Sequence, residues 1–126
     1  MGRHAPQKYL KTDDKTPRAQ EERIALRMGG KRVAGSGASM YSKADVRGVE
    51  MASGGDKIGF LVECKKTEHA SISVKWSWLR KITAEALAQN KEPALAIEIQ
   101  GGDNDPNVDR DWICVPVRIW EKMQNG

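Results

Sequence analysis

Residues that bind zinc or form disulfides are scarce in this sequence. It contains only two cysteines and two histidines in 126 residues. Cys64 and Cys114 stand apart inside apolar, strand-like runs, without the spacing of a CxxC pair or of a zinc site. We therefore expect both cysteines to be buried free thiols.

Long hydrophobic runs are also absent. No apolar stretch approaches the roughly 20 residues that a membrane helix requires, and residues 1–16 contain no apolar segment that could serve as a signal peptide. We expect residues 1–16 to form a flexible basic arm and residues 17–126 to form a single domain. The expected location is the cytoplasm of a prokaryote or of a virus's host, without a membrane partner.

Acidic residues are too few to balance the basic ones. The chain contains 21 lysines and arginines against 17 aspartates and glutamates, which gives a formal net charge of +4. The excess is concentrated in the first 32 residues, where nine basic residues face four acidic ones. Such a segment fits a polyanionic partner, because lysine and arginine release counterions from phosphates. A solvated basic tail would have the same composition.

Local patterns predict an α/β domain with a mixed central sheet flanked by helices. Thr16 can cap a first helix that has Pro17 at its first position and ends at Gly29-Gly30. Ser73 can cap a long second helix. The predicted helices cover residues 17–28, 74–90 and 117–123, and the predicted strands cover residues 31–34, 45–51, 58–65, 94–100 and 112–115.

The most informative segment is the third predicted strand, which carries charged residues within an apolar run. Side chains alternate along a strand, so Glu63 and Lys65 project from one face while Val62 and Cys64 point into a core. Asp45 stands at the start of the preceding strand, where a hairpin can bring it beside Glu63. Two converging carboxylates can hold Mg²⁺, which prefers oxygen ligands.

An adjacent lysine would complete a phosphodiesterase site. During phosphodiester hydrolysis a water molecule attacks phosphorus while negative charge grows on the phosphate oxygens, and a cation beside the carboxylates can orient the water and stabilise that charge. Asp45, Glu63 and Lys65 form the minimum set for this reaction. Taken alone, a Glu-x-Lys pair such as Glu63 and Lys65 is more often an ordinary surface salt bridge.

The order of these features resembles a known family. Glu22 in the first helix, Gly35-Ser36-Gly37 in a loop, Lys43-Ala44-Asp45-Val46 and Val62-Glu63-Cys64-Lys65 before a long helix resemble the archaeal-type (Hjc-like) Holliday junction resolvases. These enzymes belong to the PD-(D/E)xK nuclease superfamily, whose domain is restriction-endonuclease-like. The similarity extends from about Arg18 to Val115. Ala44 departs from the proline that names the superfamily.

The resemblance implies a set of site residues. Asp45, Glu63 and the backbone carbonyl of Cys64 would bind Mg²⁺, with Mn²⁺ as a substitute, and Lys65 would position the attacking water. Glu22 would reach the metal directly or through water, and Ser36 would lie near the scissile phosphate. Glu21 is an alternative to Glu22, and Ser39 and Ser42 are alternatives to Ser36.

Basic residues around the predicted site are candidates for contact with DNA phosphates. Any one of them could instead be a hydrated surface charge. Trp76 and Trp78 could stack on unpaired bases, pack against the sheet or lie in a subunit interface, whereas we expect Trp112 and Trp120 in the core. The candidate DNA contacts are Arg18, Arg23, Lys31, Arg32, Lys43 and Lys66.

The resemblance favours one function among three. A Holliday junction resolvase would place paired symmetric nicks in four-way junctions and would act as a homodimer, with the long helix and residues 112–115 as candidate interface. The alternatives are another PD-(D/E)xK endonuclease with nicking, restriction-like or branch-trimming activity, and a non-catalytic nucleic-acid-binding module. The short single-domain form suggests a viral or prokaryotic source.

Overall fold

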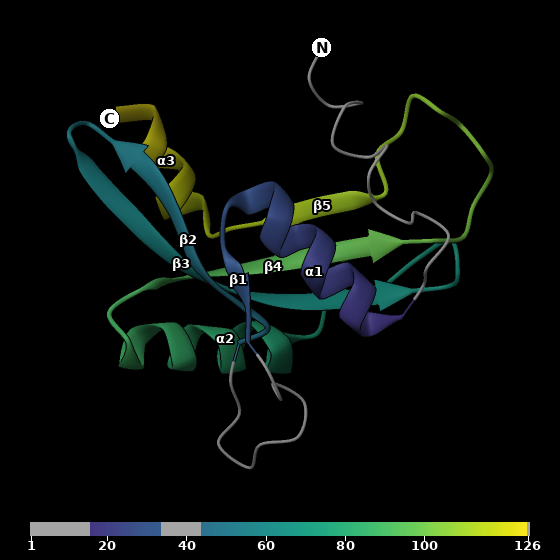
Figure 1. Cartoon of the computed structure of the whole chain (residues 1–126), viewed down its shortest axis with the longest axis horizontal. Coiled ribbons are helices and arrows are strands. Elements are labelled where there is room, and N and C mark those ends of the chain that lie inside the picture. Colours follow the sequence, from purple (N-terminus) through teal and green to yellow (C-terminus); the bar gives the residue numbers. More distant parts are fainter. Residues whose placement is uncertain (1–15, 34–43, 126) are drawn as a thin grey trace.

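The computed structural model describes residues 16–33 and 44–125, which form a five-stranded sheet with three helices (Figure 1). The predicted arm therefore lies outside the described residues except for Thr16, and so does the loop at 34–43. In chain order the elements are α1 (Pro17–Met28), β1 (Lys31–Arg32), β2 (Val46–Ser53), β3 (Asp56–Thr67), α2 (Trp76–Ala88), β4 (Glu92–Ile99), β5 (Asp111–Cys114) and α3 (Val117–Asn125).

Helix α1 has the ends that its sequence predicts. The Thr16 hydroxyl accepts a hydrogen bond from the Ala19 amide at 3.1 Å, and Pro17 occupies the first helical position. Gly29 ends the helix with a left-handed φ of 73°, a conformation that costs glycine little. The prediction of a helix over residues 17–28 is confirmed.

The sheet is mixed, in the order β1-β2-β3-β4-β5. Strands β2 and β3 form an antiparallel hairpin, β3 and β4 are parallel, and β4 and β5 are antiparallel. The parallel pair needs a crossover connection, which α2 provides. These features confirm the predicted α/β class with a mixed central sheet.

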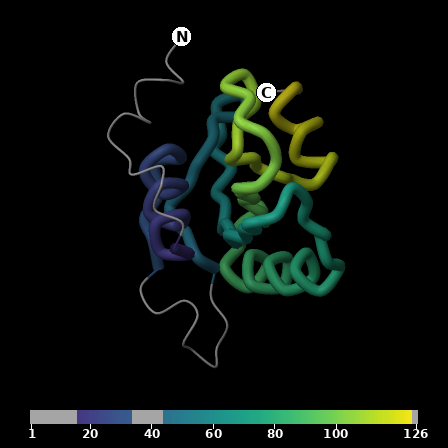
Figure 2. The backbone as a smooth tube through the Cα atoms, turned by 90° about the vertical axis from the view of Figure 1, so that its right-hand side faces the viewer, coloured from purple at the N-terminus to yellow at the C-terminus, as the bar shows by residue number. Residues whose placement is uncertain are grey.

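Helices α1 and α2 lie on opposite sides of the strands (Figure 2). Ile24 of α1 joins a buried cluster with Val62 and Phe60 of β3. On the other side, Leu61 of β3 packs with Ile82 and Ala86 of α2. Since successive residues of β3 serve opposite layers, Glu63 and Lys65 share the side of Leu61 and face α2.

Three details of the sequence prediction are wrong. Helix α2 begins at Trp76 after Lys75 rather than after Ser73, and Lys75 makes no side-chain capping bond. Trp112 is 56% exposed because it lies on β5, the edge strand of the sheet, and Trp120 on α3 is 57% exposed. Both cysteines are free, but Cys114 is exposed on that edge and Cys64 is half-buried.

No helix among residues 16–33 and 44–125 is both long and apolar enough to span a bilayer.

Candidate metal and phosphodiesterase site

Strand β3 brings the predicted charged pair together in an enclosed position. Glu63 is 5% exposed, and the Lys65 ammonium lies 3.5 Å from its Oε2. The strand is central in the sheet, with β2 on one side and β4 on the other. A carboxylate held this deeply is not an ordinary surface salt bridge, since burial removes most of its hydration.

The hairpin places Asp45 against the backbone next to Glu63. The Asp45 amide donates to the Val62 carbonyl at 2.9 Å, and the Cys64 amide donates to Asp45 Oδ2 at 2.7 Å. Asp45 is 8% exposed. The hairpin thus brings Asp45, the residue before β2, against the part of β3 that carries Glu63, as the sequence predicts.

A bulge in β2 contributes to this placement. The pairing of β2 with β3 shifts register between Val46 and Val49, and Gly48 within the bulge has φ 77°. A side chain at Gly48 would be strained in this left-handed conformation. The bulge lets Val46 pair with Val62, so that Asp45 ends up beside the Cys64 amide.

Helix α1 presents Glu21, not Glu22, to the site. Glu22 is 55% exposed and pairs with Arg18 at 2.8 Å, a contact between neighbouring turns on the outer side of the helix. The Glu21 side chain is 13% exposed and pairs with Arg32 at 3.5 Å. The negative charges of Asp45 and Glu63 contribute to raising its pKa. The structure therefore places the alternative, Glu21, nearer to Asp45 and Glu63 than Glu22, and a contact of Glu21 with a metal stays a prediction.

Gln20 explains why Glu21 faces inward. Its side-chain amide donates to the Lys65 carbonyl at 2.7 Å, and the residue is 2% exposed. Successive helical residues are about 100° apart around the axis. With Gln20 fixed to β3, Glu21 falls at the border of the sheet and Glu22 turns to solvent.

The site concentrates negative charge, and this changes its titration. Burial raises the pKa of Glu63 above its ordinary value, and the nearby Asp45 raises it further, against the lowering effect of Lys81 and Lys65. Burial and then Asp45 likewise raise the pKa of Glu21, although Arg32 lowers it. These carboxylates repel one another, and a bound cation would relieve that repulsion.

Two residues of α2 belong to the site: Lys81, which the sequence patterns did not indicate, and Trp78, which they indicated in other roles. The Lys81 ammonium lies 3.4 Å from both carboxylate oxygens of Glu63. Burial lowers the pKa of Lys81, but Glu63 and Glu85 more than offset this, so the pKa is raised. The Trp78 ring lies under the Lys65 ammonium, 4.7 Å from the ring centroid, which is a cation–π contact.

The donor set fits a cation that needs few protein ligands. No group of three or more histidine, cysteine, aspartate or glutamate side chains in the described ranges is arranged to hold a metal ion. Mg²⁺ is commonly bound by one or two carboxylates and several waters, a requirement that Asp45 and Glu63 meet. The crowded, buried carboxylates support the same assignment, since they are costly without a cation.

The Cys64 carbonyl points in a direction that suits a third ligand. The Val62 carbonyl faces β2, where it accepts from Asp45. Backbone groups two residues apart on a strand point the same way, so the Cys64 amide and carbonyl also face that side, where the amide meets Asp45. Burial raises the pKa of the Cys64 thiol well above its ordinary range. The Cys64 side chain packs against the core cluster that contains Phe60 and Val62, so only the backbone of Cys64 faces Asp45.

The candidate DNA contacts separate into different environments. Arg23 is 5% exposed and bonds Asp111 through Nε at 2.8 Å, with Glu98 at 3.0 Å. The prediction that Arg23 contacts DNA is wrong, because it is a buried ion-pair residue that joins α1 to β4 and β5. Lys31 and Arg18 are exposed, Lys66 is half-buried, and Arg32 is engaged with Glu21.

Two predicted residues, Ser36 and Lys43, lie outside the described residues together with the alternatives Ser39 and Ser42.

Comparison with known proteins supports the fold. The chain matches no protein-family model, and no curated protein sequence is significantly similar to it. Among solved structures, it is similar to the Holliday junction resolvase Hjc of Archaeoglobus fulgidus, an archaeal hyperthermophile, with a TM-score of 0.55 and 17% identity over 79% of this chain and 74% of that chain. The predicted α/β fold, a mixed central sheet flanked by helices, is therefore confirmed, and it matches the fold of that resolvase.

Proposed function

We propose that the protein is a Mg²⁺-dependent DNA endonuclease that resolves Holliday junctions. The observation that carries the proposal is the convergence of Asp45, Glu63 and Lys65 at one enclosed point of the sheet. Its fold is similar to that of a Holliday junction resolvase, and this similarity supports the choice of a branched DNA substrate.

The chemistry assigned to the site is hydrolysis of a phosphodiester. Asp45, Glu63 and the Cys64 carbonyl would hold Mg²⁺, which supplies Lewis acidity and lowers the pKa of bound water. Lys65 would orient the attacking water and offset charge on the phosphate oxygens. The water oxygen forms a bond to phosphorus while one ester P–O bond breaks. The water's proton leaves to solvent, and the released sugar oxygen takes up a proton from solvent and departs as a hydroxyl. Trp78 would restrict the motion of Lys65 by its cation–π contact.

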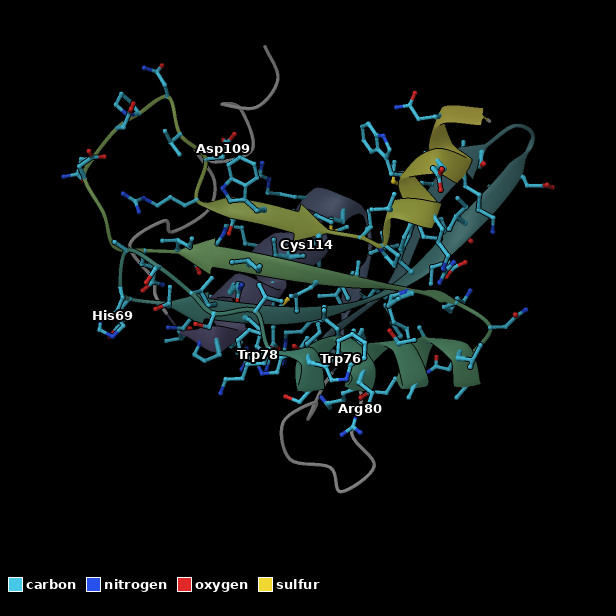
Figure 3. The ribbon with its side chains drawn as sticks, turned by 180° about the vertical axis from the view of Figure 1, so that it is seen from behind. His69, Trp76, Trp78, Arg80, Asp109 and Cys114 are labelled. Carbon is cyan, nitrogen blue, oxygen red and sulfur yellow. The ribbon has the colours of Figure 1, made fainter. Side chains whose placement is uncertain are left out.

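Paired nicks require two sites, so the proposal includes a homodimer. A groove of about 330 Å³ between α2 and β5 is lined mainly by apolar side chains, including Leu79 and Val115. Trp76, on the helix that forms one wall of the groove, is 76% exposed, and Figure 3 shows Trp76 and Trp78 on α2 with Cys114 on β5. An exposed apolar surface on a domain of this size supports an interface with a second copy. These are the elements that the sequence analysis suggested.

The decisive experiment compares DNA substrates. The protein with Mg²⁺ should place symmetric nicks in opposite strands of a labelled four-way junction and leave the matching linear duplex largely intact, as resolved by denaturing electrophoresis. Equal cleavage of the duplex would support a different endonuclease. If neither substrate is cut with Mg²⁺ or Mn²⁺, the enzyme proposal fails.

Adjacent glutamates of α1 offer a matched pair of variants. Glu21→Gln should reduce the cleavage rate by roughly 10- to 100-fold, the usual effect of removing a group that supports metal ligands. Glu22→Gln, a change of the same chemistry at the exposed position, should alter the rate less than about twofold. Single-turnover cleavage with saturating enzyme measures both. A larger loss for Glu22→Gln than for Glu21→Gln would contradict the assignment of Glu21.

A further inference from the structure

The Lys81 ammonium of α2 lies between two carboxylates. Its Nζ is 3.4 Å from both carboxylate oxygens of Glu63 and 3.5 Å from Oε2 of Glu85, one turn further along the helix. The Glu63 and Glu85 side chains are 7% and 13% exposed. One ammonium is thus shared by two enclosed carboxylates from different elements.

Glu85 has acceptor capacity that the described contacts do not use. Both of its carboxylate oxygens are buried, and neither accepts a hydrogen bond from the described part of the chain. An ionised carboxylate can accept about four hydrogen bonds, and leaving a buried acceptor unsatisfied is costly. The ion pair with Lys81 lacks hydrogen-bond geometry, so a closer approach of the ammonium would benefit Glu85.

A divalent cation would compete with Lys81 for Glu63. Like charges a few ångströms apart repel strongly in a site with little water. Glu85 is four residues after Lys81 on the same helix, so rotation of the Lys81 side chain alone can move the ammonium toward it. No movement of α2 is required.

We propose that Lys81 is a positioning residue that holds Glu63 while the site has no divalent cation and moves to Glu85 when a cation binds. The inference rests on the proposed role of Glu63 as a metal ligand. Glu85 acts only through Lys81 in this scheme. The exchange keeps the Glu63 carboxylate in place without a metal and gives the displaced ammonium a partner.

A double-mutant cycle on Mg²⁺ binding tests this exchange without DNA and without cleavage. Calorimetry should show about fivefold tighter Mg²⁺ binding by Lys81→Met, because the competing ammonium is removed. Glu85→Gln should bind Mg²⁺ about fivefold more weakly, because the displaced ammonium loses its alternative partner. Both changes are modest coupling effects. In the Lys81→Met background, Glu85→Gln should have almost no effect. Lys57→Met and Glu50→Gln, which alter an exposed pair in the β2–β3 hairpin, should leave affinity unchanged.

The cycle separates exchange from simple electrostatics. If Glu85 attracted the cation directly, its effect would persist or grow without Lys81, and that result would overturn the proposal. Absence of any Mg²⁺ binding by the folded wild-type protein would also overturn it, together with the metal site. If the cycle behaves as expected but no DNA is cut, the exchange stands and the nuclease proposal fails. Thermal denaturation establishes that each variant is folded. If Lys81→Met does not fold, Glu85→Gln still tests the exchange, because glutamine has the same size and shape as glutamate.

Discussion

Asp45→Asn should reduce Mg²⁺-dependent cleavage by at least about 100-fold, because even groups that only support metal ligands typically contribute 10- to 100-fold. The asparagine oxygen can still accept the Cys64 amide hydrogen bond that Asp45 accepts at 2.7 Å. The variant should therefore fold. Its loss of activity would come from the missing negative charge, and single-turnover cleavage of a four-way junction measures it.

Thermal denaturation supplies a second readout for Asp45→Asn. Asp45 contributes to the raised pKa of Glu63, after burial itself, so its neutralisation should leave the metal-free protein as stable as wild type or more so. Mg²⁺ should raise the Tm of the wild type and not that of the variant. The control is Asp56→Asn, the same change at the exposed turn of the same hairpin, which should preserve cleavage. Retained cleavage by folded Asp45→Asn would refute the site.

Arg23→Met should destabilise the protein by about 3–5 kcal/mol, the usual result of removing one partner from a buried ion pair. It would leave Asp111 and Glu98, whose side chains are 11% and 7% exposed, without the guanidinium that lies 2.8 and 3.0 Å from them. Arg27 at 3.4 Å from Asp111 compensates only in part. The Tm should fall by roughly 10 °C or more, as measured by calorimetry.

Arg18→Met provides the matched control for Arg23. Arg18 pairs with Glu22 on the surface, with side chains 72% and 55% exposed, and such pairs contribute about 0.3–0.5 kcal/mol. This variant should keep its Tm and bind DNA more weakly.

Neutralising both partners of Arg23 in the Arg23→Met background, by Glu98→Gln and Asp111→Asn, should recover part of the stability that Arg23→Met loses. An unchanged Tm for Arg23→Met would show that the buried cluster does not stabilise the fold.

Signals that act within a few residues predicted the fold well. The Thr16 cap, Pro17 and Gly29 define α1, and alternation along β3 placed Glu63 and Lys65 on one side. The β2–β3 hairpin then fixes the position of Asp45. The turn that joins the two strands allows few pairing registers, and few of these keep Val46 and Val62 both buried. The centre of the site could be predicted for this reason.

Contacts between distant segments were not predictable from such signals. The choice between Glu21 and Glu22 depends on the hydrogen bond from Gln20 to Lys65, 45 residues away. Lys81 is 18 residues from Glu63 and meets it only because α2 crosses that side of the sheet. Arg23 lies in a basic segment and therefore looked like a DNA contact in the sequence. Its burial depends on its ion pair with Asp111, 88 residues away. Which side of each helix faces the sheet, and which distant residues form ion pairs, therefore determine the positions of these side chains.

The hydrogen bond from the Cys64 amide to Asp45 also bears on how much water a bound ion would retain. Asp45 Oδ2 is committed to that amide, so Asp45 is poorly suited to grip a cation with both oxygens. Ca²⁺ prefers six to eight oxygens and often takes bidentate carboxylates, whereas Mg²⁺ gives up its hydration shell reluctantly. Under the proposed function, a site with so few protein oxygens would favour the smaller, more hydrated ion and would leave water on it for hydrolysis.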